Sequence, residues 1–214
     1  MKKILLTISA IAGFVFVGFA QDYGFEKGNV ILEGSFRASS SNNGNLSTKE
    51  SNFSFRPKVG YFISDKFALG VDVILSQSKR DSDPESSSFT KQRGNDFAAG
   101  VFGRYYFLEI GSRFKTYTEV GARYNQARMR AFDDPNVDEQ KFGFNGFSTS
   151  AGIGANFFLT ERIAINYLFT DLIAFSTSKQ NDAPNAKSVS RFDANLNSFN
   201  NFFGSSSFGL TFKF

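Results

Sequence analysis

The sequence lacks three residue types that carry much of protein chemistry: its 214 residues include no cysteine, no histidine and no tryptophan. Without cysteine, disulfides, thiolate nucleophiles and cysteine-ligated metals are excluded. Without histidine, the commonest general base and the commonest metal ligand are both missing. We therefore expect no catalytic residue, no cofactor and no metal site.

A large excess of one charge is lacking as well. The 24 Lys and Arg residues against 20 Asp and Glu residues give a formal net charge of +4. Removal of Lys2 and Lys3 with a leader segment would lower this charge to +2. A field this weak does not favour nucleic acid as a partner.

Long apolar runs are missing everywhere except at the N-terminus. There a basic start precedes an apolar run over residues 4–19, and a small-x-small pattern ends at Ala20. This arrangement predicts a cleaved secretory signal peptide over residues 1–20 and a mature domain over residues 21–214. A membrane anchor is the alternative, but no basic stop-transfer cluster follows the run. No later segment reaches the roughly 18 continuous apolar residues that a spanning helix needs.

What the sequence does contain is a hydrophobic pattern with a period of two, which is typical of strands with one apolar face. From Phe67 to Val73, every second residue is large and apolar, and the residues between are small or charged. Eight segments alternate in this way, each near the roughly 9–11 residues that a tilted strand needs to cross a bilayer. They cover about residues 28–38, 50–62, 67–78, 95–107, 113–127, 145–159, 163–176 and 202–214. In the seventh, Asp171 falls on the apolar face, which indicates either a bulge or a strand that has already left the hydrocarbon.

The connections between these segments alternate between long polar loops and short turns. The long ones are residues 39–49, 79–94, 128–144 and 177–201, and the short ones are residues 63–66, 108–112 and 160–162. Outer-membrane barrels have short periplasmic turns and long outer loops, so both ends of the mature chain are expected on the periplasmic side. Residues 181–201, rich in Asn, are interpreted as an outer loop or strand extension.

The direction of the apolar face separates a membrane barrel from a soluble lipocalin-like barrel, which buries that face. Charged residues interleaved with Gly and Ala on the polar face favour a crowded polar interior. Aromatic residues next to the short turns favour an interfacial girdle. These residues are Tyr61, Phe62, Phe67, Tyr105, Tyr106, Phe107, Phe114, Phe157, Phe158, Phe212 and Phe214. We therefore predict that the apolar face points to lipid.

The predicted fold is all-β: an eight-stranded antiparallel up-and-down transmembrane β-barrel, closed because every backbone polar group must be paired in hydrocarbon. Its interior is expected to hold a charged cluster, because the polar face points inward. The members are Glu33, Arg37, Arg56, Lys58, Asp72, Arg104, Arg113, Lys115, Glu119, Arg123 and Lys213. Since cations outnumber anions, water, Tyr hydroxyls or loop carboxylates are expected among the partners. The sequence does not assign the pairs.

The signal peptide, the eight strands and the ending Gly209-Leu210-Thr211-Phe212-Lys213-Phe214 resemble small porin-like outer-membrane β-barrel proteins of the OmpA-transmembrane-domain and OmpX type. Residues 57–70 also look like the second-strand, turn, third-strand unit of these barrels. In that family the ending is a C-terminal insertion signal, which here corresponds to Leu210, Phe212 and Phe214. The resemblance implies the outer membrane of a Gram-negative-type envelope and the barrel-assembly machinery as a partner. Unlike full-length OmpA, the chain is expected to carry no peptidoglycan-binding domain after the barrel.

Three functions remain open at this point. The first is a structural or interaction protein whose long loops contact lipopolysaccharide or an external partner. The second is a narrow porin-like channel for ions or small solutes, biased toward anions by the cationic interior. The third is an outer-membrane lipid-modifying enzyme, which the absence of histidine makes the least favoured.

Charged loop residues offer two further interpretations. The acidic groups Asp81/Asp83/Glu85 and Asp133/Asp134/Asp138/Glu139 could hold calcium or share divalent ions with lipopolysaccharide phosphates, but they lack EF-hand spacing, so solvated loops are favoured. The pairs Asp133/Asp134 and Asp138/Glu139 could do acid–base chemistry, but they lie in a polar loop with no sign of burial, so this role is not favoured. The cations Lys79, Arg80, Lys91 and Arg93 could contact lipopolysaccharide phosphates, although a role in solubility is favoured.

Overall fold

The structure is a computed structural model that describes residues 23–45, 47–82, 91–132, 139–181, 183, 185–194 and 207–214. The predicted signal peptide over residues 1–20 lies outside the described residues. So do the acidic loop positions Asp83, Glu85, Asp133, Asp134 and Asp138. In the described part of the chain, no helix has the length and hydropathy to cross a membrane.

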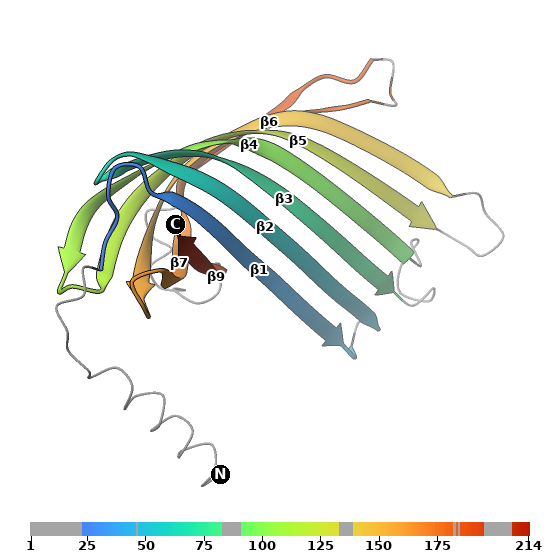
Figure 1. Cartoon of the computed structure of the whole chain (residues 1–214). Helices are drawn as coiled ribbons and strands as arrows, with labels where there is room; N and C mark the ends of the chain where they lie inside the picture. The colour runs from blue at the N-terminus through green and yellow to red at the C-terminus, as the bar shows by residue number, and fades with distance from the viewer. Residues whose placement is uncertain are drawn as a thin grey trace, which may run out of the picture.

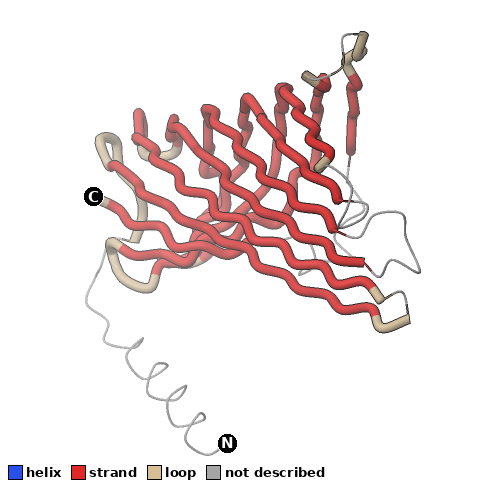
Figure 2. The backbone as a smooth tube through the Cα atoms, turned by 90° about the vertical axis from the view of Figure 1, so that its right-hand side faces the viewer, coloured by secondary structure: helices blue, strands red, loops and turns tan. Residues whose placement is uncertain are grey.

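The regular structure consists of β-strands that run obliquely between two ends of the molecule (Figure 2). The strands are β1 (Val30–Asn43), β2 (Thr48–Ser64), β3 (Phe67–Ser82), β4 (Lys91–Ile110), β5 (Phe114–Phe132), β6 (Gln140–Phe158), β7 (Ile163–Gln180), β8 (Val189–Ala194) and β9 (Ser207–Lys213). The short turns after β2, β4 and β6 lie at one end, which we call the short-turn end. We call the opposite end, where β1, β3 and β5 finish, the long-loop end (Figure 1).

Eight of these strands close into an antiparallel ring. From β1 to β7, each strand pairs with the next along the chain. The short strand β9 then pairs with β7 on one side and with β1 on the other, so that the sheet has no open edge there. The predicted eight-stranded up-and-down barrel is confirmed, and its closure satisfies the backbone groups that hydrocarbon cannot.

The ninth strand, β8, lies outside this ring. Its six residues pair with the long-loop half of β7, from Ile173 to Ser178, as an extension beyond β9. These residues come from the segment 181–201, for which the sequence indicated a loop or a strand extension. Part of the segment is therefore an extension, and residues 195–206 lie outside the described residues.

The strands at the long-loop end are longer than the sequence predicted. β1 and β2 continue to Asn43 and Thr48, so the predicted long loop 39–49 is reduced to residues 44–47. The prediction of a long loop at this position is wrong. In this region polar residues occupy both faces of the two strands, so the sequence shows no hydrophobic period. The backbones are paired all the same, as between Ser40 and Ser51.

The apolar faces of the strands point outward. On β3, Val71 is 56% exposed whereas its neighbour Asp72 is 2% exposed. Leu69 and Leu75 share the outward face with Val71. This is the arrangement of a barrel in lipid and the reverse of a lipocalin-like barrel, which buries its apolar face.

Two irregularities in the pairing of β6 with β7 explain the phase of Asp171. Register shifts occur on either side of the pair between Asp171 and Gly152. Phe169 and Leu172 have no partner in the β6–β7 register, so each is an extra residue in β7. Each extra residue shifts the inward–outward alternation of the side chains that follow it in β7. Of the two interpretations offered for Asp171, a change of phase by bulging is the one that the structure contains.

Candidate functional site in the barrel lumen

Six charged side chains from five neighbouring strands meet in the short-turn half of the lumen. We call them the ionic cluster: Glu33, Lys58, Asp72, Arg104, Glu119 and Arg123. Each lies at an inward position of its strand, and each is no more than 7% exposed. The two-residue period places them inside, and the oblique course of the strands brings β1 to β5 to a common level.

Arg104 of β4 is the centre of the ionic cluster and has no exposed surface. Its Nη1 and Nη2 donate to the two carboxylate oxygens of Glu33 at 2.9 and 3.2 Å. Its Nε and Nη2 donate to Oε2 of Glu119 at 3.0 and 2.6 Å. The planar guanidinium of Arg104 thus bridges the carboxylates of Glu33 and Glu119.

Two further cations complete the ionic cluster. Lys58 Nζ donates to Oε1 of Glu119. Arg123 donates from Nε to Oδ2 of Asp72 at 2.8 Å, and its Nη2 lies 3.9 Å from Glu119. Of the eleven charged residues predicted on the polar face, the ionic cluster contains all three carboxylates and three of the eight cations. Balance is what a narrow interior requires, since an unpaired buried charge is costly.

A chain of neutral hydrogen bonds extends the ionic cluster across the lumen. The Tyr106 hydroxyl donates to Asn156 Oδ1 at 2.8 Å, and Asn156 Nδ2 donates to Thr211 Oγ1 at 3.0 Å. The Thr211 hydroxyl then donates to Glu33 at 3.1 Å. This chain connects β4, β6, β9 and β1. Sequence reasoning missed these neutral residues, although each occupies an inward position in the two-residue pattern.

The remaining predicted members lie outside the ionic cluster, toward either end of the lumen. Arg37 is exposed near the long-loop end, and Arg56 is half-buried. Near the short-turn end, Arg113 donates to the Tyr23 hydroxyl at 2.6 Å. Lys115 donates to Glu109 at 2.6 Å, and Lys213 donates to the carbonyl of Gly24 at 2.9 Å. A Tyr hydroxyl and a carboxylate beside a turn are partners of the kind that the cation excess predicted.

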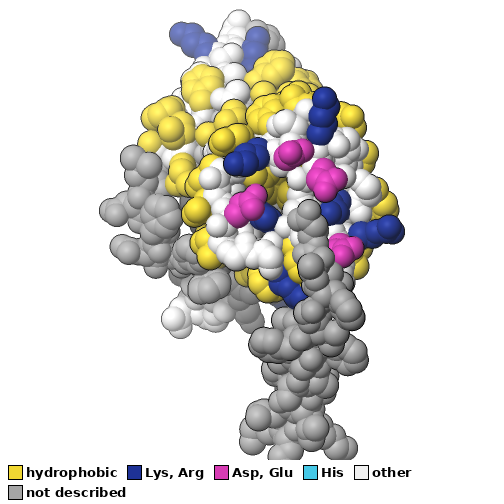
Figure 3. All heavy atoms as spheres, turned by 60° about the vertical axis from the view of Figure 1, so that its left-hand side comes forward, with side chains coloured by type: hydrophobic (Ala, Val, Ile, Leu, Met, Phe, Trp, Pro, Cys, Tyr) yellow, Lys and Arg dark blue, Asp and Glu magenta, His cyan; other side chains and the backbone are white. Residues whose placement is uncertain are grey.

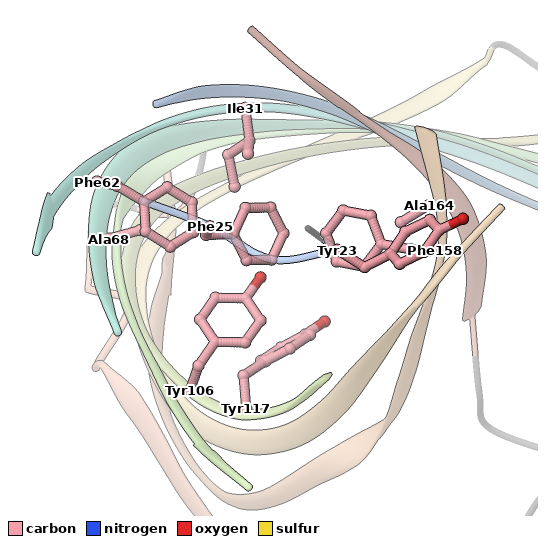
Figure 4. Close-up of a cluster of buried hydrophobic side chains, with 9 residues drawn as sticks. All are labelled: Tyr23, Phe25, Ile31, Phe62, Ala68, Tyr106, Tyr117, Phe158 and Ala164. Atoms are coloured by element: carbon pink, nitrogen blue, oxygen red, sulfur yellow. The ribbon is translucent and has the colours of Figure 1, made fainter. Parts of the chain in front are cut away.

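An aromatic plug fills the lumen at the short-turn end. Tyr23 and Phe25, which precede β1, lie inside the curve of the strands (Figure 4). Phe25 stacks on Phe62 with ring centroids 4.4 Å apart, and it contacts Tyr106 at 4.8 Å and Phe158 at 5.1 Å. These five residues, which we call the aromatic plug, are buried. The chain before β1 thus fills the end of its own barrel.

The aromatic plug corrects the predicted girdle. Phe62, Tyr106 and Phe158 point inward and are buried, so their assignment to a lipid interface is wrong. Tyr61, Tyr105 and Phe157, their neighbours in the chain, point outward and are exposed. Each aromatic pair therefore has one ring on each face, as the alternation of a strand dictates.

The short-turn end also carries charged side chains near the opening of the barrel. The space-filling view shows them gathered within a border of hydrophobic side chains (Figure 3). In the turn after β2, Asp65 accepts a hydrogen bond from the backbone N–H of Lys27 at 2.9 Å. This contact fastens the segment of the aromatic plug to the turn after β2.

The lumen at the long-loop end is polar and open by comparison. A hollow of about 190 Å³ there is lined by the inward residues Glu50, Asn52, Arg80 and Gln92, and it reaches Lys79 and Arg93 of the outward face. Arg80 pairs with Glu50 at 2.9 Å, and both side chains are about half exposed. The described residues contain no group of three or more acidic side chains arranged to hold a metal ion.

The predicted insertion-signal residues lie on the last strand of the ring. Leu210 and Phe212 are on the outward face of β9, opposite Gly34 and Leu32 of β1. Phe214 follows β9 and is exposed, while its backbone exchanges hydrogen bonds with Val30.

Two solved structures of outer-membrane proteins are similar to this chain. OprG from Pseudomonas aeruginosa is 16% identical, with a TM-score of 0.50 over 89% of this chain and 98% of that chain. A major outer membrane protein from Thermus thermophilus is 13% identical, with a TM-score of 0.48 over 87% and 99%. At these identities the likeness concerns the fold alone, and OprG supports it. A search of curated proteins finds no match.

The sequence also matches the family model described as the outer membrane protein beta-barrel domain, over residues 7–211. This match agrees with the closed ring, with the outward apolar faces and with the short turns at one end. The chain therefore belongs to the outer membrane protein beta-barrel domain family and is an integral β-barrel protein of the outer membrane.

Proposed function

We propose that this protein is a sealed barrel with a structural and interaction role, rather than a channel or a lipid-modifying enzyme. The observation that supports it is the filling of the short-turn half of the lumen by the aromatic plug and the ionic cluster in succession. A permeating ion would have to displace Arg104 from two carboxylates. Such a displacement is unfavourable, because it leaves buried charges unpaired.

In this proposal, recognition takes place at the long-loop end. The strands there extend past the apolar belt, by which we mean the outward band of apolar side chains that includes Leu69, Val71 and Leu75. A rigid scaffold with variable connections suits recognition. Lipopolysaccharide and external macromolecules are the partners that such a surface would meet.

Conductance in planar bilayers tests the sealed barrel. The native protein, refolded and inserted, is expected to give no steady single-channel conductance in about 1 M KCl, where surface charges are screened over roughly 3 Å. A general porin inserted in the same bilayer is the control for sensitivity. A steady, salt-dependent conductance that Arg104→Phe abolishes would overturn the proposal in favour of a narrow channel.

We also propose that Leu210, Phe212 and Phe214 are read by the barrel-assembly machinery during insertion. Their outward position on the closing strand, between β1 and β7, supports this role. Phe214→Gln is expected to lower the amount of heat-modifiable barrel in cells while leaving refolding in micelles unchanged. Lys213→Gln, the neighbouring substitution on the inward face, is the control. Equal insertion of Phe214→Gln and native protein in cells would contradict the proposal.

A further inference from the structure

Four cations stand side by side on the outward face of neighbouring strands near the long-loop end. The register places Lys79 of β3 opposite Arg93 of β4, and Arg93 opposite Arg130 of β5. Arg130 in turn lies opposite Lys141 of β6. We call these four residues the cationic row. Their strands lie next to one another along the broad face of the barrel (Figure 1).

The strand alternation sets the outward direction of the cationic row. On β3, Lys79 follows the outward Leu75 by four residues, and on β4 Arg93 precedes the outward Phe97 by four. The next residue of β3, Arg80, has the opposite parity in the strand and pairs with Glu50 of β2, which shares the inward parity of Lys58. The cationic row therefore lies just above the apolar belt, at the level of an outer-leaflet headgroup.

The opposed positions of the four cations are unfavourable for the stability of the sheet. Like charges directly opposite each other on adjacent strands are destabilising. In the described residues, two carboxylates offset part of the charge: Asp81 lies 2.6 Å from Arg93, and Glu139 lies 3.5 Å from Arg130 and 3.3 Å from Lys141. The cationic row keeps a positive excess, which suits an anionic ligand.

An apolar groove lies directly below the cationic row on the same outward face. It has a volume of about 570 Å³, and its apolar wall is formed by Phe53, Phe55, Leu75 and Phe97. Polar residues complete the lining: Ser76, Gln77, Asn95, Asp96, Gln126 and Arg128. Arg128 closes the edge of the groove that faces the cationic row. Arg128 also lines a second hollow, of about 360 Å³, together with Arg130 and Lys141. The surface thus passes from aromatic and aliphatic side chains to cations within a few residues of each strand.

We propose that this outward face binds a phosphorylated glycolipid of the outer leaflet. One acyl chain would lie in the apolar groove, and the sugar phosphates would contact the cationic row. Arg and Lys form strong charge-assisted hydrogen bonds with phosphate, and the groove accounts for selection of a lipid over a free anion. The inference rests on the proposed interaction role and deepens it. Its failure would be distinguishable from the failure of the sealed-barrel proposal, because lipid binding and conductance are measured separately.

The test uses the native barrel refolded in non-ionic micelles and titrated with a bisphosphorylated lipid A that carries a fluorescent label. Dephosphorylated lipid A and inorganic phosphate serve as the other two probes. Saturable binding of lipid A is expected, with binding of the dephosphorylated lipid weaker by about tenfold or more, a difference of about 1.4 kcal/mol. Equal binding of the two lipids, or displacement of lipid A by equimolar inorganic phosphate, would overturn the proposal.

Matched variants locate the binding. Arg93→Gln combined with Arg130→Gln is expected to weaken lipid A binding by about tenfold or more, because two charge-assisted contacts are lost. Its urea midpoint in lipid-free micelles is expected to stay unchanged. Arg80→Gln, at the same level but facing the lumen, is the control with native affinity. Native affinity in the double variant would refute the assignment.

Two more variants keep the proposal testable if that double variant unfolds. Lys79→Gln combined with Lys141→Gln removes the two ends of the cationic row and is likewise expected to weaken binding. Phe97→Ala removes a ring from the apolar groove and is expected to weaken binding of the acylated lipid roughly threefold to tenfold. Native affinity in both would contradict the inference.

Discussion

Arg104 and Arg93 lie on the same strand, β4, and their charges are satisfied in opposite ways. Arg104 is inside the short-turn half, has no exposed surface and is held by two carboxylates. Arg93 is on the outward face of the long-loop half, where one carboxylate partners it and about a third of its side chain is exposed. The comparison extends to the two halves as a whole. In the ionic cluster of the short-turn half, charges are buried and balanced; in the cationic row of the long-loop half, cations gather at the surface in excess.

The cost of leaving a charge unpaired accounts for this difference. In the narrow lumen, few waters replace a lost partner, so each buried cation must meet a carboxylate. At the outward surface of the long-loop end, headgroups and water screen the charges, and an excess of cations remains available to a ligand. The same residue types therefore hold the barrel together in one half and form a binding surface in the other.

Removal of Arg104, the central cation of the ionic cluster, should have the largest effect on the free energy of unfolding. Arg104→Met is expected to lower the free energy of unfolding by about 3–5 kcal/mol, because Glu33 and Glu119 lose their shared partner. Urea titration in micelles measures the effect. Arg93→Met, on the same strand, is the control and should cost no more than about 1 kcal/mol. Similar losses of unfolding free energy in Arg104→Met and Arg93→Met would show that burial does not account for the difference between the two arginines.

A charge placed on the outward face of the short-turn half should have the next largest effect. Val71→Arg is expected to cost about 2–4 kcal/mol, because Val71 lies in the middle of the apolar belt. The cost should fall to about 0–1 kcal/mol for Gln77→Arg, which lies on the same face of β3 but near the cationic row. Equilibrium unfolding in lipid vesicles gives both values. A larger cost at Gln77 would invert the depth profile inferred for this strand.

Much of the fold could be predicted because one rule, the two-residue period, governs every strand. It identified the eight ring strands and the outward position of Val71, and the phase change at Asp171 was a visible signal of irregularity. The extensions of β1 and β2 carried no such signal, because polar residues occupy both faces beyond Ser40. The rule works where the two faces differ in polarity, and it fails where they do not.

The contents of the lumen were predicted less well, for two physical reasons. Pairs such as Glu33 with Arg104 depend on how far neighbouring strands are staggered, and composition does not fix that stagger. Tyr23 and Phe25 precede the first strand and belong to no periodic segment. Phe62, in contrast, could have been placed correctly, since it shares the inward parity of Lys58.

Truncation of a ring in the aromatic plug should have an intermediate effect that is confined to the short-turn end. Phe25→Ala is expected to cost about 1.5–3 kcal/mol, because its ring is buried against Phe62, Tyr106 and Phe158. The segment before β1 can detach without opening the ring of strands, so the barrel should remain heat-modifiable on gels. Phe25→Leu keeps most of the apolar contact and should retain most of the stability. A loss of heat-modifiability would mean instead that the aromatic plug is needed for closure.

The smallest effect is expected from an ion pair that has the chemistry of the ionic cluster but lies at the long-loop end. Arg80 and Glu50 are 2.9 Å apart, a distance similar to that between Arg104 and Glu33, yet both side chains are about half exposed. Arg80→Gln should therefore cost only about 0.2–1 kcal/mol, and the cost should vanish in high salt because exposed pairs are screened. Urea titration at low and high salt checks both statements, with Arg104→Met as the buried counterpart whose loss should persist in high salt. If Arg80→Gln lost as much stability as Arg104→Met, solvent exposure would not determine how much an arginine–carboxylate pair contributes to the stability of this barrel.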